Sequence, residues 1–524
     1  MKLPFMRNAK RNAIAALANN AVRLVFPFLN RTLFLWLLGP EYLGLNGLFG
    51  SVLGVLMLAE LGFGTAVVCS MYKPVAENDR ALLCAYLKFY RTVYRCVGTA
   101  IFAVGLALLP FLRNLVHGDV PPDVDLHILY IIHLVNTSAS YFLFAYRGAV
   151  LNAHQRNDVV SNIRTAVSVA QYIAVFLILL VTRNYYHYVL ATVAFTVVQN
   201  LLLVRSSRRL FPDIEPRGEL PADQRRRVVS DVKSIFLHKV GGVISHSSDN
   251  LIISSMLGLV AVAAYGNYYY VVTSVAGLVS AICTSTQGGF GNRIYLETRR
   301  RNFELFMKTD RLAMTVVVWC AAMMCALYAP FIEIWTKGDP TLERHALTPV
   351  LMVLYFLVNQ SRQALLTFKA AASLWREDRM KPVVAGAVNL AVSIALVLLL
   401  PDDFKLDGVI FGTILSYAAV QVPWEAHVVF TKFFGRNESR AYWREHLRFA
   451  AIAIVLCAAT WLAAFAVPLE GFAGLAAKGV ASALVSCSIV GLIFRGDIRD
   501  IYEAIAKPRS NEVLQLPHVS KDVG

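Results

Sequence analysis

Long apolar runs alternate with short polar connections along the whole chain. A run of about 20 apolar residues is the length that crosses a bilayer as a helix. The pattern predicts fourteen spans, near residues 13–38, 43–71, 95–112, 125–146, 158–181, 185–205, 234–257, 261–290, 312–334, 346–370, 382–400, 407–431, 449–468 and 471–494. The sequence therefore predicts an all-α integral membrane protein with 14 transmembrane helices.

The distribution of basic residues tests this count, because cytoplasmic loops of membrane proteins are enriched in Lys and Arg. With the amino terminus in the cytoplasm, 38 of the 50 Lys and Arg fall in cytoplasmic segments, five in the seven outer loops and seven inside spans. A missed or extra span would scramble this alternation. The pattern therefore predicts a multi-pass protein with cytoplasmic N- and C-termini.

Composition narrows the function classes. The chain of 524 residues is 57% hydrophobic and 16% charged, whereas soluble domains carry about 25% charged residues. The net charge of +16 lies in short loops between apolar runs, so no nucleic-acid partner is expected. The eight cysteines form no CxxC motif and lie in or beside spans. They are interpreted as small buried hydrophobic residues, and no metal site is expected.

One long polar connection divides the chain. Residues 205–234 hold three prolines and separate six predicted spans from eight, which is typical of a linker. We predict an N-lobe over 1–208, a cytoplasmic linker over 209–233, a C-lobe over 234–432, two extra helices over 433–496 and a cytoplasmic tail over 497–524. The predicted outer loops are all short, which leaves no room outside the membrane for a folded catalytic domain.

The first and seventh spans look like copies of each other when their ends are aligned on Leu38-Gly39 and Leu257-Gly258. The polar positions coincide although the residues differ: Asn20 aligns with Lys239, Arg23 with Gly242, Pro27 with His246, Asn30 with Asp249, and Arg31 with Asn250. The next span begins alike in both, with YLGLNGLF and AYGNYYYV. Each copy starts on the same side of the membrane, so we predict two pseudo-symmetric six-helix lobes about an axis along the membrane normal.

These polar positions are spaced 3, 4, 3 and 1 residues apart in each copy. They are interpreted as one face of each helix. A guanidinium at the centre of a spanning helix costs roughly 2.5–3.5 kcal/mol, and such groups usually face a bundle interior or a water-filled cavity. The two faces are therefore predicted to meet across a central cavity. Arginine matches phosphate with bidentate hydrogen bonds, so Arg23 and Arg31 predict an anion site for an extended, multiply charged group.

Other charged groups in the spans leave alternatives open. Glu60 should lie at the depth of Arg23, either as its structural ion-pair partner or as a cation or proton site beside an anion site. Arg31 has no acidic residue at its depth on the second span. On the tenth span, Lys369 is expected to extend to the cytoplasm, and the deeper Arg362 is a candidate for substrate contact.

Several motifs are missing from the sequence. It holds no GxxxxGK[ST], no HExxH and no nucleophile elbow, so neither ATP hydrolysis nor an enzymatic activity is expected. Transport work would then come from an ion gradient, the membrane potential or removal of the product.

Four segments resemble the bacterial polysaccharide repeat-unit flippases, the Wzx-type branch of the multidrug/oligosaccharidyl-lipid/polysaccharide (MOP) exporter superfamily. They are Leu38–Arg80 with its Glu60-Leu61-Gly62, His238–Val271 with Asp249-Asn250, Ser361–Leu396, and Gly412-Thr413 followed by Ser416. The resemblance implies two six-helix lobes plus two helices that work by alternating access. The implied cargo is an undecaprenyl-pyrophosphate-linked oligosaccharide, moved from the inner to the outer leaflet of the bacterial inner membrane for capsule, O-antigen or exopolysaccharide synthesis.

The resemblance also suggests roles for single residues. In the related lipid II flippases, arginines on the first helices line a cationic cavity, and that role is carried to Arg23 and Arg31. The candidates for pyrophosphate binding are Arg23, Arg31, Lys239 and Arg362; those for sugar or cavity contacts are Asn20, Asn30, His246 and Asn250; those for ion coupling are Glu60 and Asp249. No cofactor is expected apart from a coupling H⁺ or Na⁺. The implied partners are membrane lipids, a glycan polymerase and glycosyltransferases.

Three other functions remain as alternatives. A lipid II-type peptidoglycan precursor flippase would differ in its cargo only. A MATE-like cation-coupled exporter of small molecules would need an acidic, aromatic cavity, which the basic stripe argues against. A glycan polymerase or ligase would need a sizeable outer loop with catalytic Arg or His, which this sequence lacks.

Overall fold

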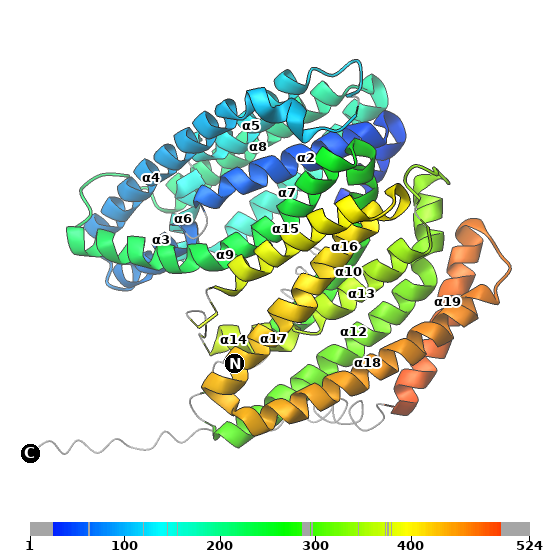
Figure 1. Cartoon of the computed structure of the whole chain (residues 1–524). Coiled ribbons are helices and arrows are strands. Elements are labelled where there is room, and N and C mark those ends of the chain that lie inside the picture. Colours follow the sequence, from blue (N-terminus) through cyan, green and yellow to red (C-terminus); the bar gives the residue numbers. More distant parts are fainter. Residues whose placement is uncertain are drawn as a thin grey trace, which may run out of the picture.

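The computed structural model describes residues 25–60, 63–118, 120–143, 145–154, 156–285, 294, 297–343, 345–372, 374, 377–378 and 380–493. Of residues 233–246 in the middle of one long helix, only the backbone is described. Every regular element in these ranges is a helix, which confirms the predicted all-α fold. Figure 1 shows two groups of helices, one from each half of the chain, set at an angle to each other.

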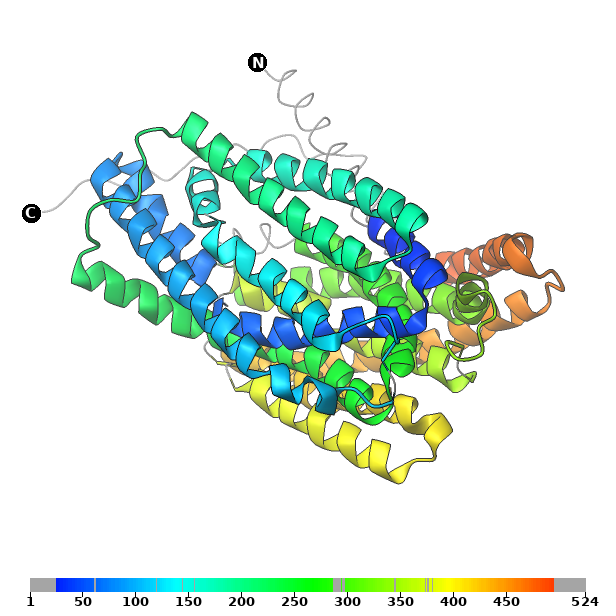
Figure 2. The same cartoon turned by 90° about the horizontal axis from the view of Figure 1, so that it is seen from above.

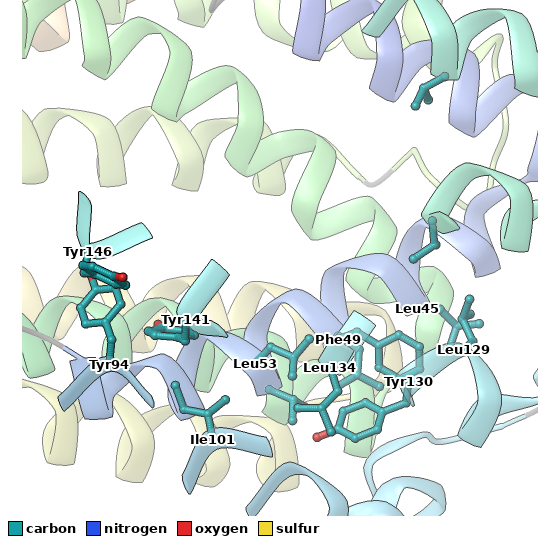
Figure 3. Packing of buried hydrophobic residues seen from close by; sticks show 14 of the residues in the cluster. Leu45, Phe49, Leu53, Tyr94, Ile101, Leu129, Tyr130, Leu134, Tyr141 and Tyr146 are labelled. Atoms are coloured by element: carbon teal, nitrogen blue, oxygen red, sulfur yellow. The ribbon is translucent and has the colours of Figure 1, made fainter. Parts of the chain in front are cut away.

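The N-lobe contains the short apolar helix Val25–Leu38 and the helices that follow it to residue 210. These are α2 (Pro40–Leu56), η1 (Met57–Glu60), α3 (Phe63–Ala76), α4 (Arg80–Ala107), η2 (Leu109–Leu115), α5 (Leu126–Phe142), η3 (Ala145–Arg147), α6 (Gly148–Ala153), α7 (Asn157–Thr182) and α8 (Tyr185–Leu210). The second predicted span is thus two helices and a 3-10 turn, and the turn carries Glu60. Figure 3 shows the lobe's core, in which Phe49 and Leu53 of α2 pack beside Leu134 of α5.

The C-lobe is likewise a series of helices broken at several points. It contains α9 (Ala222–Met256), α10 (Leu259–Ser285), α12 (Arg299–Thr336), α13 (Leu347–Gln360), α14 (Gln363–Ala371), α15 (Lys381–Leu399), η4 (Asp402–Phe404), α16 (Lys405–Leu415), the π-helical turns η5 (Ser416–Gln421) and η6 (Phe430–Phe434), and α17 (Val422–Val429) between them. The last two helices, α18 (Arg436–Phe465) and α19 (Gly471–Ile493), pack against α12. They lie at one edge of the molecule, orange in Figure 2.

Part of the predicted linker is helical. Between α8 and α9 only residues 211–221 lie outside a helix, because α9 begins at Ala222. This connection is held against the N-lobe by ion pairs, from Arg80 to Asp213 at 2.8 Å and from the buried Arg147 to Glu215 at 2.6 Å. The helix α9 then packs against α2 and α3 of the N-lobe and α15 of the C-lobe.

Membrane crossing follows from helix length and composition. Within the described residues, seven helices are long and apolar enough to cross a bilayer, or eight if the pair α4 and η2, bent by 61°, counts as one span. Helices lie in each of the fourteen predicted ranges, but several are broken. The chain is thus a multi-pass membrane protein, and the count of fourteen crossings stays a prediction.

Besides the contacts of α9, the lobes touch near the predicted outer loops. Here α2 packs on α10 so closely that a Cβ on Gly44 would overlap the carbonyl oxygen of Leu259. The indole of Trp335 donates to Thr32 Oγ1 at 2.7 Å, and the indole of Trp36 donates to the Trp335 carbonyl at 2.9 Å. These contacts close the seam between the lobes on the predicted outer side.

Candidate functional site

A cavity with a volume of about 660 Å³ lies between the two lobes. Three helices form most of its wall: α2 from the N-lobe, and α9 and α10 from the C-lobe. The polar lining residues are Arg31, Asn46, Ser51, Ser247, Asn250, Tyr265, Tyr269, Tyr270 and Thr273, and the wall also contains Gly47, Gly50, Gly54 and Gly266. Among these described residues there is one cation and no carboxylate, so the cavity favours an anionic group with many hydroxyls.

Arg31 is held in this wall by neutral groups. Its Nε donates to Asn267 Oδ1 at 2.8 Å, and its guanidinium lies 5.9 Å from the centre of the Tyr270 ring. No acidic side chain among the described residues forms an ion pair with it. Gly266 lies against the guanidinium: a Cβ there would lie 2.6 Å from Nη2, so the end of the Arg31 side chain would have to shift. The remaining guanidinium donors are the natural partners of a phosphate.

Asn250 lies in the opposite wall, as the repeat predicts. Arg31 and Asn250 occupy equivalent positions in the two copies and line one cavity. The Asn250 amide donates to Ser51 Oγ of the N-lobe at 2.8 Å, while its Oδ1 is buried and has no hydrogen-bond partner among the described residues. This pair of residues agrees with the predicted meeting of two polar faces.

The neighbouring positions in the two repeats do not face this cavity. Asp249 points into the C-lobe, where its carboxylate accepts hydrogen bonds from Tyr265 at 2.9 Å, Asn389 at 3.0 Å and Thr413 at 2.9 Å. It is 2% exposed, and no Lys or Arg among the described residues pairs with it. Fewer of the predicted polar positions therefore line the cavity than the sequence pattern suggests, because the side chains of adjacent residues on a helix point about 100° apart.

Asn30 likewise points into the N-lobe, toward a second cavity of about 300 Å³. Its Nδ2 donates to the Tyr188 hydroxyl at 3.0 Å, and its Oδ1 is buried without a partner in the part of the chain that the structure describes. The cavity lies between the first helix, α2, α5, α7 and α8. It is lined by Pro27, Asn30, Asn46, His133, Asn136, Gln171, Tyr172, Val175, Tyr188, Val189 and Thr192.

Glu60 is the last residue of the turn η1 and lies beside two tyrosines. It accepts hydrogen bonds from the hydroxyls of Tyr94 and Tyr141, the latter at 2.5 Å. The two rings lie 5.3 Å apart, and Figure 3 shows them side by side in the N-lobe core. The alternative partner, Arg23, lies outside the described residues, so the choice between a structural pair and a coupling site stays open.

Arg362 belongs to a buried charge cluster at the predicted cytoplasmic end of the C-lobe. Its Nη1 donates to Glu425 Oε1 at 2.8 Å and to Gln421 at 2.7 Å, and it does not line the cavity around Arg31. The same carboxylate binds Lys381, and Asp378 pairs with both Lys369 and Lys381. The expectation that Lys369 extends to the cytoplasm is wrong: it is 1% exposed, because Asp378 and Glu425 supply buried partners.

Four further candidates lie outside what the structure describes. Asn20 and Arg23 precede the first described residue, and the side chains of Lys239 and His246 fall in the part of α9 given only as backbone. Their roles stay predictions.

Sequence reasoning missed the residues that position Arg31. Asn267 and Tyr270 both lie in the AYGNYYYV segment, which the repeat had marked only as the start of a span. Four polar or aromatic residues follow Gly266 there, an unusual density for an apolar span. This density of polar and aromatic residues is the sequence signal that could have predicted a cavity-lining surface there.

The sequence profile of the family described as polysaccharide biosynthesis protein matches residues 9–286, more than half of the chain. The chain belongs to this family. A search among curated proteins finds no match.

Solved structures share the fold of this polysaccharide biosynthesis protein. A lipid II flippase MurJ in an inward closed conformation matches with a TM-score of 0.67 and 12% identity, over 93% of this chain and 99% of that one. An inward-facing MATE family multidrug resistance transporter of the MOP superfamily matches with a TM-score of 0.59 and 12% identity, over 78% and 94%. An outward-facing MATE transporter matches with a TM-score of 0.53 and 14% identity, over 81% and 94%. The chain therefore has the fold of this flippase and of these MOP superfamily transporters.

Proposed function

We propose that this family member is a flippase that moves undecaprenyl-pyrophosphate-linked oligosaccharides from the inner to the outer leaflet by alternating access. The observation that carries the proposal is Arg31: a half-buried cation, positioned by neutral groups, in a polar cavity between two lobes. A guanidinium left without a carboxylate inside a membrane protein is costly unless an anion completes it.

The cavity suits the headgroup of such a lipid. Arg31 would bind the diphosphate, and Asn250 would bond sugar hydroxyls beside it. Gly50 of α2 lines the cavity beside open space, since a Cβ there would meet no atom within 4 Å. From the sequence, Arg23 and Lys239 would add positive charge, and Asn20 and His246 would add polar contacts. Arg362 would bind the headgroup only if the headgroup reached its guanidinium, which is already bound to Glu425.

A MATE-like exporter fits this cavity less well than the proposed flippase, and a lipid II-type flippase fits it equally well. A MATE-like exporter of cations would place its cargo beside Arg31, with no carboxylate among the described lining residues to bind it. A lipid II-type precursor presents the same diphosphate to Arg31, so only the sugar and peptide parts of the cargo distinguish it. The match to the polysaccharide biosynthesis family favours the oligosaccharide.

Asp249 is the stronger candidate for ion coupling. Its carboxylate is buried among neutral oxygen and amide groups, and Thr413 and Ser393 also contact the Val409 carbonyl at 3.2 and 3.4 Å. A buried carboxylate without a cationic partner favours uptake of a proton or a small cation. Glu60 would be the second site, in the N-lobe.

The proposal also includes the surroundings of the protein. It places the chain in the bacterial inner membrane with both termini in the cytoplasm. A glycan polymerase and glycosyltransferases would act on either side of the transport step, for capsule, O-antigen or exopolysaccharide synthesis.

The test is transport by the purified protein in proteoliposomes. Undecaprenyl-pyrophosphate-linked oligosaccharide, lipid II and a cationic dye are supplied separately, and protein-free vesicles serve as the control. The proposal expects the oligosaccharide lipid to change leaflet fastest. Faster movement of lipid II would show that lipid II, and not the oligosaccharide lipid, is the preferred cargo. Movement of the dye alone would support the MATE-like exporter.

A further inference from the structure

We infer that the second cavity, inside the N-lobe, is a binding subsite for one uncharged sugar unit of the transported lipid. The inference rests on the proposed function and extends it from the diphosphate to the sugar. It starts from the position of the cavity. Asn46 of α2 lines both the central cavity and the N-lobe cavity, so one side chain forms part of both walls. Asn30 and Arg31, adjacent in the chain, reach one cavity each.

The chemistry of the wall matches hydroxyl groups. Eight of the eleven lining residues carry hydrogen-bonding side chains, and among them there is no carboxylate, lysine or arginine. Four are amides, which offer donors and acceptors together, as paired sugar hydroxyls require. Tyr172 and Tyr188 add rings that an apolar sugar face can cover.

The hydrogen bonds inside the wall leave some of these groups unused. Asn46 Oδ1 accepts from Tyr185 at 3.3 Å, and Asn136 Oδ1 accepts from Thr196 at 2.8 Å. Asn30 Oδ1 is buried without a partner, and the Gln171 side chain forms no hydrogen bond within the described residues. A buried amide oxygen without a donor is destabilising, so a ligand that donates to it is favoured.

The alignment of the two repeats shows how this cavity differs from the surroundings of Asp249, the candidate ion site in the C-lobe. In the alignment of the two copies, Asn30 and Asn46 fall on Asp249 and Tyr265, which contact each other in the C-lobe. The same alignment continues on later helices. Gln171 of α7 falls within two positions of Asn389 of α15, and Thr192 of α8 falls within two positions of Thr413 of α16. At equivalent positions, the C-lobe thus has the carboxylate of Asp249 with its hydrogen-bonding neighbours, and the N-lobe has neutral amide side chains. The change from acid to amide removes the charge that a cation needs and keeps the polar groups that a neutral polyol needs.

The size of the cavity sets the size of the ligand. About 300 Å³ is at the lower end of small-molecule sites, which run roughly from 300 to 1,000 Å³. A single pyranose ring fits this space, whereas a diphosphate would enter a site without positive charge among its described residues. The central cavity would therefore hold the diphosphate, and the N-lobe cavity one sugar attached to it.

The test compares two lipids on the full chain in nanodiscs. The probes are sugar-free undecaprenyl pyrophosphate and the undecaprenyl-pyrophosphate-linked oligosaccharide fraction extracted from the source cells. Gln171→Leu removes the amide at similar volume, Tyr172→Ala removes a ring, and Gln199→Leu is the matched control on α8, outside both cavities. We expect Gln171→Leu to weaken binding of the oligosaccharide lipid about 5- to 10-fold, with the sugar-free lipid and the control unchanged within about twofold.

The outcomes separate the two proposals. If wild type binds neither lipid, the proposed function fails and the subsite fails with it. If wild type binds both, and neither Gln171→Leu nor Tyr172→Ala changes the preference for the sugar-bearing lipid, the subsite is wrong and the flippase stands. A Na⁺-dependent stabilisation that Gln171→Leu abolishes, with sugar binding unchanged, would make the cavity an ion site and also overturn the inference.

Discussion

Arg31 of the first helix and Asn267 of α10 are joined across the two lobes by a hydrogen bond of 2.8 Å from Nε to Oδ1. The bond occupies one guanidinium donor and orients the others. The cation that lines the cavity is thus fixed by a residue of the opposite lobe. Movement of one lobe against the other would change both the seam and the position of Arg31.

The first prediction concerns Arg31 itself. Arg31→Ala should lower the flipping rate of the oligosaccharide lipid in proteoliposomes by at least about tenfold, because a charge-assisted contact with the diphosphate contributes roughly 1.5–3 kcal/mol. Arg31→Lys should be intermediate, since it keeps the charge and loses the bidentate geometry and the bond to Asn267. Arg95→Ala, at an exposed position on α4, is the control. Normal transport by Arg31→Ala would refute the anion site.

The second prediction concerns ion coupling. Asp249→Asn has nearly the same shape and removes the charge, so transport should lose its dependence on an imposed Na⁺ or pH gradient. The measurement is the flipping rate with and without each gradient. Asp407→Asn is the matched control: Asp407 is also buried in the C-lobe, accepts from Thr348 at 2.7 Å and pairs with His345 at 2.9 Å. It should lower thermal stability and keep the gradient dependence. Gradient-dependent transport by Asp249→Asn would exclude this carboxylate as the coupling site.

Much of the fold was predictable because membrane helices are long, apolar and separated by basic loops. Those two signals placed a helix in every predicted range, and the internal repeat put Arg31 and Asn250 in one cavity. What the repeat could not supply was side-chain direction. Asn30 and Asp249 lie next to these residues in the sequence and point into their own lobes.

Lys369 shows a second limit. A lysine near a span end is normally interpreted as extending to the membrane surface. Its partner Asp378 lies beyond the end of α14, and Glu425 lies on α17. Contacts between separate elements depend on packing that no local pattern encodes, so this ion cluster was invisible to sequence reasoning.

The third prediction tests whether that cluster is structural. Glu425→Gln should lower the thermal unfolding midpoint in detergent, because Arg362 would lose its carboxylate partner and Lys369 and Lys381 would be left to share Asp378. Breaking a buried pair costs about 3–5 kcal/mol. Arg362→Gln alone should also destabilise. In the double variant, the two losses should be less than additive, with a coupling of about 0.5–3 kcal/mol.

The same variants decide the role of Arg362. If Arg362→Gln leaves the midpoint unchanged and reduces binding of undecaprenyl pyrophosphate, the headgroup role predicted from the sequence is supported. If stability falls and lipid binding per folded molecule does not, Arg362 is part of the scaffold.

The last prediction concerns the seam on the predicted outer side. Gly44 lets α2 approach the start of α10, and even a single methyl group there would overlap the Leu259 carbonyl. A backbone carbonyl cannot turn aside as a flexible side chain can, so the helices must separate. Gly44→Ala should therefore open the cavity toward the outer side. A cysteine introduced at Asn46, which lines that cavity, should react faster with a membrane-impermeant thiol reagent added from that side.

Gly277→Ala is the control for this experiment. Gly277 lies within α10, and a Cβ there would meet open space, so the substitution adds the same methyl group to a helix without a clash. It should leave the reaction rate at Asn46→Cys unchanged and increase helix stability slightly. If both alanine variants react at the parent rate, the Gly44 contact does not hold the seam. The closure would then depend on the tryptophan contacts at Trp36 and Trp335, which Trp335→Ala would test by the same labelling.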